Sequence, residues 1–232
     1  MDIELIKENT ARIRSRLVQA ANQCGRAPEE ITLLAATKTR TPEEIRAVID
    51  AGIDACGENR AQELLEKHPS GAYAGRPLHF IGSFQSNKAH LLFGKVDMIE
   101  SLNSAKAARI LSRLGSEEGK STDVLVEVNI GLEEGKAGIL PSEVGAFCDE
   151  IAALSGLNLR GLMAIPPAGE DGAPYFAAMK ELFEQLKKDL PRSFDTLSMG
   201  MSGDFEKAIA HGATIVRVGT AIFGARDYGV KK

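Results

Sequence analysis

The amino-acid sequence predicts a closed, TIM-like (β/α)8 barrel that follows one extra N-terminal helix. Short apolar segments alternate with helix-like segments along the whole chain, which is typical of a parallel sheet whose strands are joined by helices. Eight such units can be counted in 232 residues, and barrels of this kind typically need about 250 residues. An open, doubly wound sheet is the alternative, because it shows the same alternation.

The first 24 residues form the extra helix. Ile6, Ile13 and Leu17 recur at a helical spacing among charged residues, and Cys24-Gly25 ends the segment. The eight strands are expected at residues 31–37, 54–57, 78–82, 97–100, 123–130, 157–165, 195–199 and 214–218. Helices are expected from residue 41 onward and at residues 60–68, 87–93, 104–114, 141–154, 175–189 and 204–211.

Local signals support several of these elements. Thr41-Pro42-Glu43-Glu44 is a capping box with proline at the first helical position, which indicates a helix start. The apolar run Val124-Leu125-Val126 is expected of a strand that is covered on both faces. The stretch 69–77 contains two Gly and two Pro, so we expect a surface loop there.

Composition argues against several functional classes. The chain has 28 basic and 32 acidic residues and no Lys/Arg tract, so nucleic acid is not an expected partner. No apolar stretch approaches the roughly 18 residues of a membrane span, and the acidic N-terminus does not resemble a signal peptide. The three cysteines form no close pair, which fits a reducing cytoplasm, and the four histidines lack metal-ligand spacing. We therefore expect a cytoplasmic protein without a metal.

Unusual polar residues follow the predicted strands. In a (β/α)8 barrel, ligands bind where the strands end, often with phosphate after strands seven and eight. Lys38 follows the first strand and Glu58-Asn59 the second, while Ser198–Asp204 and Arg217–Thr220 end the last two. An amine together with two Gly/Ser/Thr-rich turns suggests a ligand with an aldehyde and a phosphate. Pyridoxal 5'-phosphate (PLP) is the obvious candidate.

The two Gly/Ser/Thr-rich turns are the candidate phosphate site. Ser202-Gly203-Asp204 precedes a predicted helix and Gly219-Thr220 follows a strand, so both can present backbone N–H groups and hydroxyls to an anion. Ser-Gly-Asp before a helix is also an ordinary N-cap. The occurrence of both turns at strands seven and eight favours phosphate.

Lys38 is the candidate covalent anchor. A lysine amine that points into a barrel mouth, with its pKa lowered by burial and nearby Arg, can form a Schiff base with an aldehyde. Lys88 and Lys136 are rival lysines. Lys88 lies one turn into a predicted helix, where a phosphate or solvent contact is expected, and Lys136 lies in a loop where a surface position is expected.

Arg217 lies inside a short apolar strand, so it must either find a partner in the barrel interior or reach solvent at the rim. Beside a pyridine ring it would donate a hydrogen bond to the ring nitrogen and stay charged. An arginine there leaves the nitrogen unprotonated, which makes the ring a weak electron sink. Such a site suits holding PLP better than difficult carbanion chemistry.

Together these residues resemble the YggS/PROSC family, the pyridoxal phosphate homeostasis (PLP-binding) proteins. The string from Ser198 to Asp204 is highly specific for it. The resemblance covers nearly the whole chain and is carried by Ala36-Thr37-Lys38, Gly57–Glu63, His79–Gly82, Gln85–Lys88, Gly161-Leu162-Met163, Leu197–Asp204 and Arg217–Gly224.

The resemblance implies one PLP-binding domain over residues 1–232, a barrel of the alanine-racemase N-terminal (fold type III) kind. It implies a Schiff base on Lys38, Arg217 near the ring nitrogen, and phosphate held by Ser202, Gly219 and Thr220. The expected cofactor-binding residues are Lys38, Asn59, His79, Met163, Ser198, Met199, Ser202, Gly203, Arg217, Gly219 and Thr220. No catalytic residue is expected.

The resemblance also implies a role. Family members are thought to buffer or deliver PLP without an established catalytic activity, so PLP-dependent apoenzymes are candidate recipients. We expect a monomer, because the barrel is complete without a partner.

Two other functions stay open. An alanine-racemase-like isomerase would need a second base opposite Lys38, and none of the three tyrosines (Tyr73, Tyr175 and Tyr228) is an obvious one. A barrel that binds another phosphorylated metabolite would use Lys38 as an ion-pair partner and would form no covalent bond to it.

Overall fold

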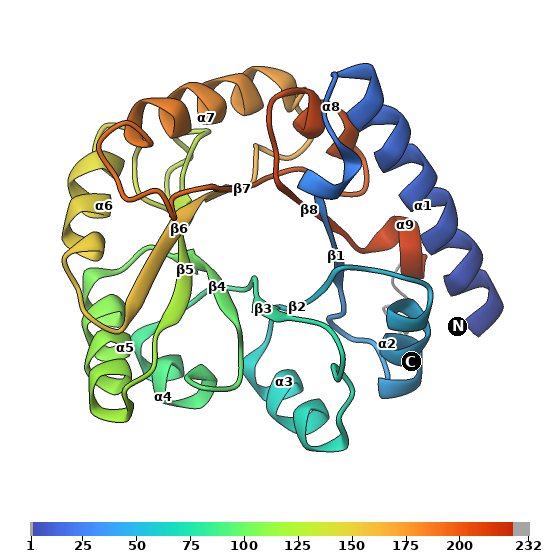
Figure 1. The fold of residues 1–232 in the computed structure, drawn as a ribbon, viewed down its shortest axis with the longest axis horizontal. Helices are drawn as coiled ribbons and strands as arrows, with labels where there is room; N and C mark the ends of the chain where they lie inside the picture. The colour runs from blue at the N-terminus through green and yellow to red at the C-terminus, as the bar shows by residue number, and fades with distance from the viewer. Residues whose placement is uncertain (1, 225–232) are drawn as a thin grey trace.

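The chain folds into an eight-stranded parallel barrel surrounded by helices, as Figure 1 shows in a view along the barrel. The structure is a computed structural model in which residues 2–224 are described. Each strand pairs with the next along the chain, and the last pairs with the first, so the sheet is closed. The predicted barrel is confirmed, and closure excludes the open sheet. The strands are β1 Thr32–Ala36, β2 Ala55–Glu58, β3 Leu78–Phe80, β4 Met98–Leu102, β5 Thr122–Val128, β6 Leu157–Ala164, β7 Thr196–Ser198 and β8 Ile215–Val218.

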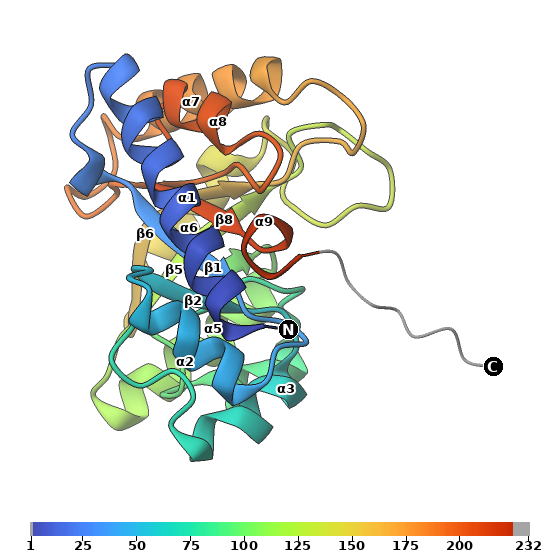
Figure 2. The ribbon, with the colours of Figure 1, turned by 90° about the vertical axis from the view of Figure 1, so that its right-hand side faces the viewer.

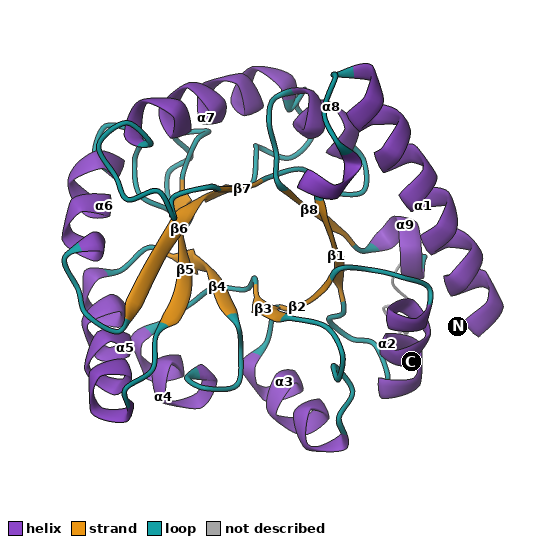
Figure 3. Ribbon diagram, in the orientation of Figure 1, coloured by secondary structure: helices purple, strands orange, loops and turns teal. Residues whose placement is uncertain are grey.

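Helices alternate with the strands and form the outer layer (Figure 3). The α-helices of the described residues are α1 Ile3–Gln23, α2 Pro42–Asp50, α3 Ala61–Lys67, α4 Ala89–Leu92, α5 Ala105–Glu118, α6 Val144–Ala152, α7 Ala173–Leu186, α8 Phe205–Ala210 and α9 Thr220–Phe223. Single 3₁₀ turns lie at Pro28–Glu30, His68–Ser70 and Ser86–Lys88. Every predicted helix overlaps an observed one. The four-residue α9 was not predicted, because one turn is too short to show a helical period.

The expected capping box starts α2. The backbone N–H of Glu44 donates to Oγ1 of Thr41 at 3.3 Å, and the Glu44 carboxylate accepts the N–H of Thr41 at 2.9 Å. This reciprocal pair satisfies two N–H groups that the first helical turn leaves unpaired. The helix therefore begins four residues after Lys38, which limits that connection to a tight turn.

Helix α1 packs across the outside of the barrel against α2, α8 and α9 (Figure 2). Its face toward the barrel carries the buried residues Ile6, Ile13 and Leu17, as the sequence pattern predicted. The Asn9 amide donates to the carbonyl of Ile222 at 2.8 Å. The first helix thus holds the short α9, whose first residue belongs to one of the predicted phosphate turns.

Alternation along β1 shows how the barrel interior is divided. Thr32 lines a cavity at the N-terminal end of the strands, Leu34 packs in an apolar cluster inside the barrel, and Ala36 lines a cavity at the C-terminal end. Leu33 and Ala35 belong to the core between strands and helices. Because successive side chains in a strand point to opposite faces, one strand contributes to both the interior and the outer core.

The stretch 69–77 is irregular and mostly exposed, as predicted, but part of it is buried. It begins within the 3₁₀ turn at His68–Ser70, and Ala72 and Tyr73 are buried. The phenol O–H of Tyr73 donates to the buried carboxylate of Glu58 at 3.0 Å. The two Gly and two Pro correctly mark irregular backbone, but they do not report this internal hydrogen bond.

Within residues 2–224 no helix is long and apolar enough to span a lipid bilayer. In the same residues no three His, Cys, Asp or Glu side chains form a cluster that could hold a metal ion.

Candidate functional site

A cavity of about 330 Å³ lies at the C-terminal ends of the strands. It brings together residues that follow β1, β2, β7 and β8, far apart along the chain. Seven of the eleven predicted cofactor-binding residues line it: Lys38, Asn59, Ser202, Gly203, Arg217, Gly219 and Thr220. Ala36, Ile81, Ile165 and Met201 complete the wall and give it an apolar side.

The other four predicted residues lie elsewhere. Met163 belongs to the apolar cluster inside the barrel, and Met199 is buried in the core between strands and helices. Ser198 is fully buried beside Arg217. His79 lines a cavity at the N-terminal ends of the strands, so it reaches the predicted site only through other side chains.

Arg217 is held by a buried polar network inside the barrel. Its Nη1 donates to Oγ of Ser198 at 2.5 Å, and its Nη2 donates to the carbonyl of Ala164 at 2.9 Å. Oγ of Ser198 donates to Oε2 of Glu100 at 2.6 Å, and Nδ1 of His79 lies 2.7 Å from Oε1 of Glu100. The sequence left two positions open for Arg217; the structure places it in the interior, with partners.

Glu100 is the counter-charge of this network, with Oε2 3.7 Å from Nη1 of Arg217. Burial acts to raise the pKa of Glu100, but the contact with His79, the charge of Arg217 and the hydrogen bond from Ser198 outweigh burial and hold the pKa below its ordinary value. The carboxylate is therefore ionised at neutral pH and can only accept, so Nδ1 of His79 carries the proton that it donates. Burial lowers the pKa of Arg217, yet a guanidinium stays charged in proteins.

Sequence reasoning missed Glu100. It is a carboxylate in the middle of the apolar strand β4, and it is fully buried. A charge within an apolar strand needs a partner, and this holds for Glu100 as it does for Arg217. Pairing these two positions would have predicted the buried ion pair.

The two predicted phosphate turns lie side by side. Oγ of Ser202 accepts the backbone N–H groups of Gly219 and Ala221, each at 3.2 Å, so the first turn anchors the second. Within the described part of the chain, the N–H groups of Gly203 and Thr220 donate to nothing. Two N–H donors of cavity-lining residues thus have no partner among residues 2–224, as an anion site requires.

Asn59 lines the same cavity, and its side-chain amide has an acceptor that no described residue engages. Its Oδ1 is buried and accepts no hydrogen bond from any described residue. The backbone of Asn59 is fixed by Gly82, where a Cβ atom would lie 1.9 Å from the Asn59 carbonyl oxygen. Unpaired buried acceptors are costly in proteins, so this amide fits a ligand that supplies a donor.

The rival lysines and the two described tyrosines lie outside this cavity's lining. Nζ of Lys88 donates to the carbonyl of Ser83 at 2.6 Å, and Lys136 is an exposed surface residue, as predicted. Tyr73 is bonded to Glu58, and the exposed Tyr175 is bonded to Glu170. Tyr228 lies outside the described residues.

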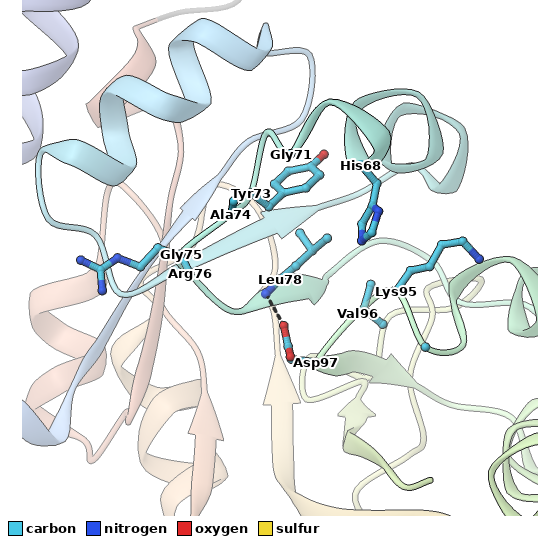
Figure 4. Close-up of a pocket in the computed structure, with 11 residues that line it drawn as sticks. His68, Gly71, Tyr73, Ala74, Gly75, Arg76, Leu78, Lys95, Val96 and Asp97 are labelled. Carbon is cyan, nitrogen blue, oxygen red and sulfur yellow. Dashed lines mark hydrogen bonds between the residues drawn. The ribbon is translucent and has the colours of Figure 1, made fainter. Parts of the chain in front are cut away.

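Two further cavities open at the N-terminal ends of the strands. One, of about 360 Å³, has Tyr73, Leu78 and Asp97 in its walls (Figure 4), and its Asp97 carboxylate accepts the N–H of Leu78 at 2.7 Å. The other, of about 550 Å³, contains Arg26 and Arg160, both bonded to neighbouring carbonyls or carboxylates. Asp97, Arg26 and Arg160 are thus already bonded to other segments of the chain and hold those segments together. The cavity at the C-terminal ends of the strands is therefore the better ligand site.

Comparison with known proteins agrees with this fold. The family model described as alanine racemase, N-terminal domain, matches residues 2–227. The chain is 43% identical to a pyridoxal phosphate homeostasis protein of Pasteurella multocida, over 96% of this chain and 98% of that protein. It is 41% identical to the Escherichia coli K12 protein of the same name, over 97% of this chain and 99% of that protein. Among solved structures it resembles PipY of Synechococcus elongatus with PLP bound, with a TM-score of 0.83, 32% identity, and coverage of 94% of this chain and all of that one.

Proposed function

The chain belongs to the family of pyridoxal phosphate homeostasis proteins, which share the alanine racemase N-terminal domain, and from this premise we propose that it binds PLP and takes part in intracellular PLP homeostasis. One observation carries the proposal. The residues that line the cavity at the C-terminal ends of the strands include a lysine, an arginine, and two backbone N–H groups and one amide oxygen that no described residue engages.

The residues of this cavity fit the parts of the cofactor. Lys38 would supply the amine that holds the aldehyde carbon, with the aldehyde oxygen leaving as water. The N–H groups of Gly203 and Thr220, with the hydroxyls of Ser202 and Thr220, would hold the phosphate. Arg217, kept charged and oriented by Ser198 and Glu100, would donate to the ring nitrogen.

Holding the cofactor is favoured over turnover. Bound PLP supplies an electrophilic carbon and, when its ring nitrogen is protonated, an electron sink. A guanidinium facing that nitrogen cannot give it a proton, which weakens the sink. An isomerase would also need a second base across the cavity, and neither described tyrosine lines it. We therefore propose a carrier or buffer of PLP, with PLP-dependent apoenzymes as recipients.

We also propose that residues 1–232 act as one domain, as a monomer in the cytoplasm. The barrel closes on itself without a free strand edge, which removes one common route to association. The three cysteines are unpaired, which fits a reducing compartment.

An absorption spectrum of the purified protein with PLP, before and after borohydride reduction, tests the proposal. The expected result is a visible band that reduction abolishes and a pyridoxyl mass on the peptide that contains Lys38. Lys38→Ala should lose the adduct, while Lys88→Ala should keep it. Arg217→Ala should keep the adduct, shift its absorption and retain PLP less well.

Two results would contradict the proposal. A protein that forms no adduct with added PLP would favour a barrel for another phosphorylated metabolite, with Lys38 as its ion-pair partner. A borohydride-fixed adduct that survives in Lys38→Ala would show that another lysine is the anchor.

A further inference from the structure

The turn that carries Lys38 has an unusual backbone. Thr39, the next residue, has a φ angle of 62°, in the left-handed region. A β-branched residue there is strained, and such a conformation persists only where surrounding contacts impose it. The contacts that hold this turn therefore decide where Lys38 lies.

Three side chains from the end of β2 and from α3 hold the turn on both sides of Lys38. The hydroxyl of Thr37 donates to Oε1 of Glu58 at 3.0 Å. Nζ of Lys67 donates to the carbonyl oxygen of Thr37 at 3.2 Å. The backbone N–H of Thr39 donates to Oε2 of Glu63 at 2.7 Å. We call Glu58, Glu63 and Lys67 the turn clamp.

Lys67 is the centre of the turn clamp. Its Nζ lies 2.8 Å from Oε1 of Glu58 and 3.4 Å from Oε2 of Glu63, so one ammonium group joins both carboxylates to the Thr37 carbonyl. Glu58 is fully buried and the Lys67 side chain is only 11% exposed. Removing the ammonium would leave a buried carboxylate without its counter-charge, which the fold must relieve by moving the acid or the turn.

Tyr73 supports the same carboxylate from the other side. Its O–H donates to Oε1 of Glu58 at 3.0 Å. Burial, followed by the charge of Glu58, raises the pKa of Tyr73, so the phenol stays protonated and remains a donor. Oε2 of Glu58 accepts no hydrogen bond from any described residue, so the hydrogen bonds that described side chains donate to this carboxylate all end on Oε1.

We propose that the turn clamp sets the position in which Lys38 reacts with an aldehyde, with Lys67 as the central positioning residue. This inference rests on the proposed function. In the reaction the Lys38 nitrogen bonds to the aldehyde carbon and the aldehyde oxygen leaves as water. None of the three clamp residues lines the cavity, so they act through the backbone of the turn.

The test compares Lys67→Met with Lys67→Arg in the full-length protein. PLP is added, samples are reduced with borohydride at timed intervals, and the adduct on Lys38 is quantified by mass spectrometry. The expected result is that Lys67→Met slows adduct formation and weakens PLP retention by about 10- to 100-fold, the range expected for one lost charge-assisted hydrogen bond. Lys67→Arg should restore both, because it keeps the charge and donors. Lys120→Met, which removes an exposed ion-paired lysine before β5, is the matched control.

The outcomes separate this inference from the proposed function. If the unmodified protein forms no adduct on Lys38, the proposed function fails. If it forms the adduct and a folded Lys67→Met protein does so at the same rate, the turn clamp is refuted and PLP binding stands. A lower melting temperature with an unchanged adduct rate would also refute it, because it would show that Lys67 only stabilises the fold.

A second variant decides the question if Lys67→Met does not fold. Glu63→Ala removes the acceptor of the Thr39 N–H and leaves the Lys67–Glu58 pair in place. We expect an adduct rate about 2- to 10-fold lower, as for one ordinary hydrogen bond. An unchanged rate in this variant would equally refute the clamp.

Discussion

Replacing Glu100 by glutamine should destabilise the protein strongly. The substitution removes a buried charge 3.7 Å from Nη1 of Arg217. Two unit charges at that separation attract by about 4 kcal/mol at an effective dielectric constant near 20. Breaking a buried pair from one side costs about 3–5 kcal/mol, because the remaining charge stays uncompensated. We expect a loss of about 3 kcal/mol in the free energy of unfolding, since Glu127 and Asp204 also act on Arg217.

The pH dependence of this loss gives a second check. The pKa of Glu100 in the folded protein is below its ordinary value of 4.5, so the ionised acid contributes stability above that pH. This contribution is lost as the pH falls through the folded pKa. The difference between the unmodified protein and Glu100→Gln should therefore be constant from neutral pH down to about 5, and should shrink in stronger acid.

Glu127 provides a matched control of opposite sign. Burial raises its pKa, against the hydrogen bond from Asn103 and the charge of Arg217. An acid with a raised folded pKa loses stability as the pH rises through its ordinary range, so Glu127→Gln should cost little or nothing at pH 7. Urea unfolding followed by circular dichroism measures both variants. A loss below about 1 kcal/mol for Glu100→Gln, or equal losses for the two glutamine variants, would refute the reasoning.

Three further predictions follow from local contacts. Ser202→Ala should lower the free energy of unfolding by about 1–2 kcal/mol and speed PLP release, because two backbone N–H groups lose their acceptor. Chemical unfolding measures the first effect and dialysis the second. Gly82→Ala should cost more than about 2 kcal/mol, because its Cβ would overlap the carbonyl oxygen of Asn59, and a thermal midpoint equal to that of the unmodified protein would contradict this. A thiol reagent at pH 8 should modify the exposed Cys24 quickly and Cys148 only after unfolding, since burial raises the pKa of the Cys148 thiol to about 12. Counting modified thiols with and without urea checks this.

The fold was largely predictable from the sequence, because its strands and helices have clear local signals. Each of the eight predicted strands overlaps an observed one, and the capping box at Thr41 starts a helix as expected. The N-terminal helix ends where Cys24-Gly25 predicted. Strand boundaries shifted by two residues at most, since hydrogen bonding with a neighbouring strand, rather than local sequence, determines where a strand ends.

Most of the cavity's predicted residues follow a strand; Arg217, inside β8, was predicted because a charge in an apolar strand needs a partner. Lys38, Asn59 and Thr220 line the cavity because the ends of parallel strands meet there. The depth of a side chain inside the barrel depends on register, which one sequence does not reveal. His79 therefore lies at the opposite end of the interior, and Glu100 was not recognised at all.

The closure of β1 on β8 has a consequence for the chain as it leaves the ribosome. Lys38 is synthesised about 180 residues before Gly219 and Thr220, which complete the same cavity. At about 5–20 residues per second, roughly 10 to 40 seconds separate the two events. During that time the growing chain contains the Lys38 amine but not yet the turn with Gly219 and Thr220. A chain interrupted before residue 219 therefore has no complete pocket. Occupancy of the pocket would therefore report that translation has passed this point.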